Sequence, residues 1–137
     1  MLNNIEVEGA RYISEALLVN NTLTSLNLSN TFIYADSNSI GAEGAKYISN
    51  ALKYNKTLTS LNLSIYIITV DGNNIRPEGV KYISEALKEN RSLTSLSLGI
   101  ISTLNIDGNR VKTTGAKRIS EALKQNNTLI NLSLSIL

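Results

Sequence analysis

The fold is decided by residues 43–63, which read EGAKYISNALKYNKTLTSLNL. Closely similar stretches begin at Glu8, Glu78 and Thr114, so the chain repeats one unit about four times. The glycine in the second position of each copy marks the period. Gly9, Gly44, Gly79 and Gly115 lie 35, 35 and 36 residues apart. Repetition at this period predicts a stack of similar units that bury a continuous core between them.

Each unit combines a helix with a strand. Ala45, Ile48 and Leu52 share one stripe of a helix, and Leu61 and Leu63 are spaced as in a half-buried strand. A strand and a helix in every unit predict an α/β solenoid with parallel strands. The helices are expected near residues 7–19, 42–54, 77–89 and 113–125. The asparagines after them suit a left-handed position at the helix end: Asn20, Asn55, Asn90 and Asn126.

Composition excludes several kinds of chemistry. The 137 residues suit a single domain, residues 1–137, and include no Cys and no His. Disulfides, thiol nucleophiles and imidazole acid–base catalysis are therefore impossible. The net charge of +2 predicts no nucleic-acid partner and no membrane surface as partner. We expect no enzymatic activity, no catalytic residue, no cofactor and no metal ion.

The repeated pattern also suggests a family. Leu-x-x-Leu-x-Leu, followed by Asn-x-Ile and a helix that opens with Gly-Ala, resembles the leucine-rich repeats. The full helix is similar to the ribonuclease-inhibitor-like subclass, which also occurs in NOD-like receptors. The resemblance covers essentially the whole chain and implies a right-handed horseshoe segment, with a parallel sheet on one side and helices on the other. It also implies a structural asparagine ladder that hydrogen-bonds to turn backbone: Asn3, Asn38, Asn73 and Asn109.

The units are larger than the roughly 28 residues typical of that subclass. The additional residues lie between the Leu-x-Leu segment and the ladder asparagine. They are rich in β-branched side chains, as in Ile65-x-x-Ile68-x-Val70. Either each unit contains two short strands separated by a bend, or one long strand continues through a bulge. We expect two short strands.

Two sets of side chains are candidates for binding a partner. The resemblance implies that one face of the sheet contacts proteins, and its candidate residues are Asn27, Thr59, Asn62 and Thr94. The enlarged segments carry aromatic anchors that differ between units, and aromatic residues dominate many interfaces. These anchors are Phe32, Tyr34 and Tyr66. The alternatives are a merely solvated sheet face and aromatic side chains that pack on one another in a small core.

The leading functional hypothesis is a non-enzymatic scaffold that binds a protein or peptide through the solenoid surface. One alternative is a self-associating fragment of a longer array, because the sequence begins and ends within a unit and leaves uncapped ends for homo-oligomers. Another, by analogy, is a bacterial effector that acts on host proteins. The first residues contain no signal peptide, so we expect a cytoplasmic location, or secretion of such an effector by another route.

Overall fold

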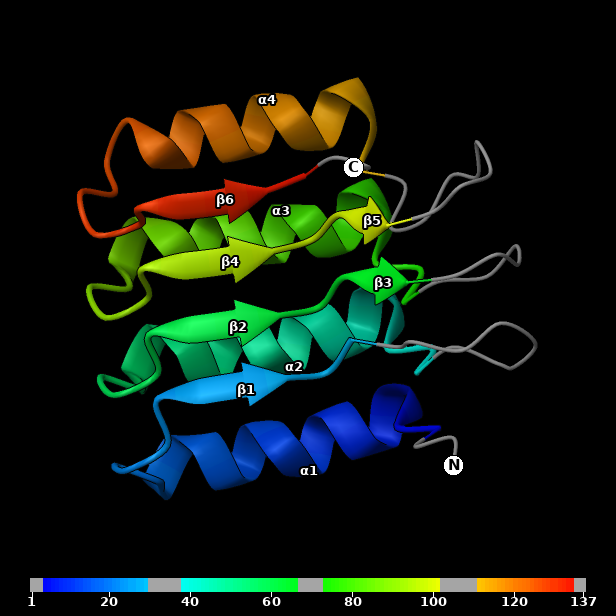
Figure 1. The fold of residues 1–137 in the computed structure, drawn as a ribbon, viewed down its shortest axis with the longest axis vertical. Coiled ribbons are helices and arrows are strands. Elements are labelled where there is room, and N and C mark those ends of the chain that lie inside the picture. Colours follow the sequence, from blue (N-terminus) through cyan, green and yellow to red (C-terminus); the bar gives the residue numbers. More distant parts are fainter. Residues whose placement is uncertain (1–3, 30–37, 67–72, 102–110, 135–137) are drawn as a thin grey trace.

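The computed structural model describes residues 4–29, 38–66, 73–101 and 111–134. The helices are α1 (Glu6–Val19), α2 (Gly41–Tyr54), α3 (Arg76–Glu89) and α4 (Lys112–Leu123). The strands are β1 (Ser25–Asn27), β2 (Ser60–Asn62), β3 (Ile65–Tyr66), β4 (Ser95–Ser97), β5 (Ile100–Ile101) and β6 (Asn131–Ser133). Figure 1 shows the helices side by side in one layer and the strands in another, with the units stacked along the long axis of the molecule.

The three-residue strands form one parallel sheet in the order β1-β2-β4-β6. Leu61 stands opposite Leu26 on one side and Leu96 on the other, and Leu96 stands opposite Leu132. The register does not slip, because a shift by one residue would turn every inward leucine towards solvent. The α/β solenoid expected from the sequence, similar to that of leucine-rich repeats, is confirmed.

A second, two-stranded parallel sheet joins β3 to β5, with Ile65 opposite Ile100. In the second and third units the enlarged segment therefore begins with a separate short strand, as the two-strand interpretation expects. One long strand with a bulge is excluded there, because β2 ends at Asn62 before β3 begins in a different sheet. The enlarged segment of the first unit, residues 30–37, lies outside the described residues.

The core lies between the helix layer and the four-stranded sheet. In the second unit Ile48, Leu52 and Leu61 are at most 1% exposed. The leucines that align with Leu61 in the first and last units, Leu26 and Leu132, are only partly buried. Each unit is therefore covered by its neighbours on both sides, which is how a solenoid buries its core.

The helix bounds differ slightly from the expected ones. Each helix begins one residue earlier, and α4 ends at Leu123, two residues before the expected end. The left-handed position expected after the helices is wrong. Asn20, Asn55 and Asn90 have extended backbone, with φ of −75°, −67° and −68°. The chain turns directly towards the next strand here, and the asparagine side chain forms the turn.

We call Asn20, Asn55, Asn90 and Asn126 the junction asparagines, because all of them except Asn20 connect neighbouring units. The Asn90 side-chain oxygen accepts hydrogen bonds from the backbone N–H groups of Ser92 at 3.0 Å and Leu93 at 2.7 Å. Its amide nitrogen donates to the Leu52 carbonyl of the preceding unit at 2.6 Å. Asn55 and Asn126 make the equivalent bonds to the carbonyls of Leu17 and Leu87, at 2.9 and 2.7 Å.

The asparagine ladder implied by the family resemblance lies at the other end of the helices. Buried Asn38 and Asn73 donate to the carbonyls of Leu28 and Leu63, each at 2.8 Å. Asn73 also reaches the Leu28 carbonyl of the preceding unit at 3.3 Å. Asn3 and Asn109 lie outside the described residues.

A glycine at each helix start allows the helices to approach closely. A Cβ placed on Gly79 would lie 3.1 Å from the Ala42 Cα and 3.1 Å from the Ala45 Cβ, both in the preceding helix. It would also lie 2.6 Å from Cγ2 of Ile75 in its own unit. The backbone atom of Ala42 cannot rotate away, so a side chain at Gly79 would push α2 and α3 apart.

Gly79→Ala is expected to lower the free energy of unfolding by about 1–2 kcal/mol, because overpacking outweighs the gain in helix propensity. Gly9→Ala is the matched control. A Cβ on Gly9 would lie 2.7 Å from Ile5 Cγ2, much as a Cβ on Gly79 would lie 2.6 Å from Ile75 Cγ2. However, no helix of the structure precedes α1, so the substitution at Gly9 displaces no neighbouring helix. Urea denaturation of both variants isolates the interhelical effect, and equal losses of stability would show that close helix packing is unimportant.

Candidate interaction surface

One face of the four-stranded sheet is turned away from the helices, which lie behind it in Figure 1. Side chains alternate along a strand, so the residues on either side of the inward leucines point outward. The parallel register aligns them in two rows. One row contains Ser25, Ser60, Ser95 and Asn131, and the other contains Asn27, Asn62, Ser97 and Ser133.

This outer sheet face is polar and uncharged over the described strands. Ser25 and Asn27 are exposed in β1, and Asn131 and Ser133 are exposed in β6. The corresponding residues of β2 and β4 are partly buried by their neighbours. Hydroxyl and amide groups in regular rows suit hydrogen bonding to another polypeptide more than attraction of a charged ligand.

The four candidate residues that the family resemblance implied already make hydrogen bonds within the solenoid. The hydroxyls of Thr59 and Thr94 donate to the carbonyls of Thr24 and Thr59 in the preceding units, at 3.0 and 3.1 Å. The side-chain oxygens of Asn27 and Asn62 each accept from the backbone N–H two residues later, at 2.9 Å. Asn27 and Asn62 belong to the outward row at the ends of β1 and β2, whereas Thr59 and Thr94 lie directly before β2 and β4. The use of these four residues in binding a partner stays a prediction.

The structure gives little information on the three aromatic candidates. Phe32 and Tyr34 lie outside the described residues. Tyr66 belongs to β3, where its backbone pairs with Ile101 of β5. Its use in binding a partner stays a prediction.

An exposed apolar side chain lies directly before β6. Ile130 is 79% exposed and occupies the position that Thr24, Thr59 and Thr94 occupy in the other units. The break in the threonine column is the signal that identifies it. An isoleucine this exposed at the edge of the outer sheet face is suited to contact with an apolar group.

The exposed side of the helix layer carries ion pairs. Arg11 bonds to both Glu8 and Glu15 at 2.5 Å, and its hydrogen bond with Glu8 lowers the pKa of that carboxyl. Lys53 donates to Glu89 at 2.8 Å, which links α2 to α3, and this hydrogen bond raises the pKa of Lys53. Pairs of this kind at the surface contribute little to stability.

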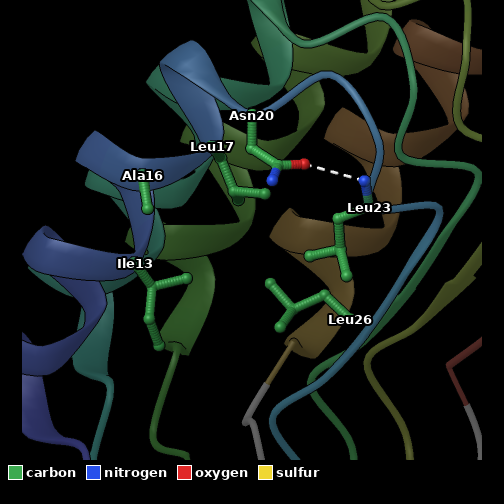
Figure 2. Close-up of a pocket in the computed structure, with 6 residues that line it drawn as sticks. All are labelled: Ile13, Ala16, Leu17, Asn20, Leu23 and Leu26. Carbon is green, nitrogen blue, oxygen red and sulfur yellow. Dashed lines mark hydrogen bonds between the residues drawn. The ribbon is translucent and has the colours of Figure 1, made fainter.

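An apolar pocket of about 220 Å³ lies on the side of the first unit that faces away from the second. Figure 2 shows the lining side chains, which come from α1, from the segment that follows it and from β1. The lining residues are Ile13, Ala16, Leu17, Asn20, Leu23 and Leu26. Leu23 is 39% exposed, whereas its equivalents Leu58 and Leu93 are 0% exposed. In the second and third units the preceding unit covers the surface that forms the pocket in the first unit.

The surfaces described above present hydroxyl, amide and apolar side chains. Within residues 4–29, 38–66, 73–101 and 111–134, no three Asp or Glu side chains gather closely enough to hold a metal ion. The helices of the described part are too short and too polar to span a bilayer.

Comparison with known proteins supports the fold. No protein-family model matches the chain, and no curated protein is similar enough to count as a match. A solved structure of leiomodin-1 actin-binding site 2 is similar, with a TM-score of 0.64 and 29% sequence identity. The likeness covers 93% of this chain but only 62% of that one.

Proposed function

We propose that this chain is a protein-interaction scaffold that binds a protein or peptide partner through its outer sheet face. The observation that carries the proposal is the likeness to an actin-binding site over 93% of the chain. The polar rows of β1, β2, β4 and β6 support it, because they form a preformed surface that loses little conformational freedom on binding. No step in this function requires a reactive side chain, a cofactor or a metal.

Actin is the first partner to test. The proposal takes it from leiomodin-1 actin-binding site 2, whose likeness to this chain extends beyond the fold to 29% of the residues. We also infer that the units belong to the ribonuclease-inhibitor-like subclass, because α1, α2 and α3 are 14-residue helices rather than short turns. A cytoplasmic location stays a prediction, which imaging of the tagged protein in its own cells would check.

Ser25→Arg is expected to weaken binding to actin at least tenfold, because it places a long charged side chain on the exposed part of β1 in the outer sheet face. Co-sedimentation with filaments and titration of monomeric actin would measure the loss. Asn50→Arg is the matched control, since Asn50 is exposed on α2 and the substitution adds the same charge. Binding by neither form of actin would exclude this partner, and equal weakening by both variants would place the binding site elsewhere.

A further inference from the structure

The two ends of the solenoid present complementary surfaces. Burial shows which way each position points, because a residue that faces the preceding unit is uncovered only in the first unit. Ala16 is exposed, whereas its equivalents Ala51, Ala86 and Ala122 are 0% exposed. By the same test Gly9, Ile13, Ala16, Asn20 and Leu23 form a leading face on the first unit.

The last unit shows the opposite pattern. Ala116 is exposed in α4, whereas its equivalents Ala10, Ala45 and Val80 are 0% exposed. Leu123 is 37% exposed, whereas Leu17, Leu52 and Leu87 are at most 2% exposed. Together with Ser120, these two residues form a trailing face, which corresponds to the surface that every earlier unit presents to the next.

We propose that the trailing face of one copy of this chain binds the leading face of a second copy, so that the solenoid continues from one molecule into the next. The pocket between α1 and β1 is the recipient surface. Its six residue types, Ile, Ala, Leu, Asn, Leu and Leu, recur at the same positions in all four units. The molecule therefore already contains this junction internally three times.

The internal junctions specify the contacts that the new one would make. A Cβ on Gly44 in α2 would lie 3.1 Å from the Cβ of Ala10, which shows how closely that alanine packs. Between two copies, Ala116 would pack against Gly9 in the same way. Gly9 is only partly buried in the single molecule, whereas Gly44, Gly79 and Gly115 are buried.

Polar groups are also complementary. The amide nitrogen of Asn20 has no partner among the described residues, whereas those of Asn55, Asn90 and Asn126 donate to carbonyls of the preceding unit. In the proposed assembly Asn20 would donate to the Leu123 carbonyl of the other copy. Within the described sheet β1 pairs only with β2, and β6 pairs only with β4, so both strand edges are open for pairing.

Further exposed apolar side chains lie at the end of α1. Here Leu18 and Val19, which are 45% and 83% exposed, occupy the positions of Lys88 and Glu89 in the third unit. At the same position Glu89 accepts a hydrogen bond from Lys53 of the preceding unit, but Tyr54 stays 64% exposed there, so Val19 lies at the rim of the leading face. Because the two faces differ, the association is head-to-tail and yields open chains rather than a closed symmetric dimer.

Three variants that each add one arginine to a helix test this assembly. Ala16→Arg blocks the leading face, Ala116→Arg blocks the trailing face, and Asn50→Arg changes the exposed side of α2. All three residues are exposed in the single molecule, so the fold is retained, and circular dichroism verifies this. The mass of the unchanged chain, measured by analytical ultracentrifugation, is expected to rise with concentration above 14.9 kDa. Asn50→Arg should behave like the unchanged chain, and the other two variants should stay monomeric.

Mixing the two blocked variants gives the decisive result. Each retains the face that the other lacks, so an equimolar mixture is expected to form dimers of about twice 14.9 kDa and nothing larger. A monomeric unchanged chain at all concentrations would overturn the proposal. Loss of association in Ala16→Arg but not in Ala116→Arg would also overturn it, because that result indicates a symmetric dimer of two leading faces.

Discussion

Replacing Asn90 with alanine is expected to lower the free energy of unfolding by about 2–4 kcal/mol. The substitution removes buried hydrogen bonds within the third unit and between the third unit and the second. Asn90 is 0% exposed and fixes the N–H groups of Ser92 and Leu93 as well as the Leu52 carbonyl. Alanine leaves the Leu93 N–H and the Leu52 carbonyl buried without partners, and each such group costs about 1–3 kcal/mol. Equilibrium urea denaturation would measure the change.

Asn20→Ala is the control for this substitution. Asn20 accepts the same pair of backbone hydrogen bonds, from Thr22 at 3.1 Å and Leu23 at 2.7 Å, but it is exposed and has no preceding unit. Water replaces its bonds, so the expected loss is only about 0.5–1 kcal/mol. If both substitutions lower the free energy of unfolding equally, the hydrogen bond between units adds no stability beyond that of the local turn.

Leu61→Ala is expected to lower the free energy of unfolding by about 3 kcal/mol. The substitution removes a fully enclosed side chain and leaves a cavity that the rigid neighbouring residues cannot fill. Leu61 is 1% exposed and stands between Leu26 and Leu96 in the sheet. The cavity would open against both adjacent units. Thermal and urea denaturation, analysed as two-state transitions, would give the loss.

Leu26→Ala provides the comparison within the same row of the sheet. Leu26 is partly buried and is covered on one side only, so its truncation is expected to cost about 1 kcal/mol. A loss at Leu26 as large as that at Leu61 would contradict the view that stability comes from neighbouring units.

Repetition made most of the fold predictable from sequence. Four aligned copies show which columns are apolar, and the leucine spacing in 58–63 is sufficient to distinguish a strand from the helix before it. The direction in which Leu61 points and the parallel pairing of β1, β2, β4 and β6 then follow from the need to bury one face of each unit.

The junction asparagines show where that reasoning fails. Asparagine after a helix is common in a left-handed position, and the sequence offers no reason to reject it. Asn20 has the same extended backbone as Asn55 and Asn90 although no unit of the structure precedes it, so the conformation comes from the local turn. In that turn the side-chain oxygen accepts from the backbone N–H groups two and three residues later, as at Asn20 and Asn90, a pattern that periodicity does not reveal.

The candidate surface was predictable in position but less so in detail. The column of residues beside the inward leucines identified Asn27 and Asn62, but periodicity does not reveal that their oxygens close local turns. The complementary end faces required burial values, because Ala16 and Ala86 are the same residue type and differ only in whether a neighbour covers them.

Amide hydrogen exchange tests most directly the claim that each unit is held by its neighbours and that the leading face is left open. In a dilute sample the Leu93 N–H is expected to exchange only through global unfolding, because the bond to Asn90 is buried. The Leu23 N–H, with the same bond to exposed Asn20, is expected to exchange far faster and to slow as concentration rises. Equal protection of Leu23 and Leu93 in the dilute sample would contradict this view.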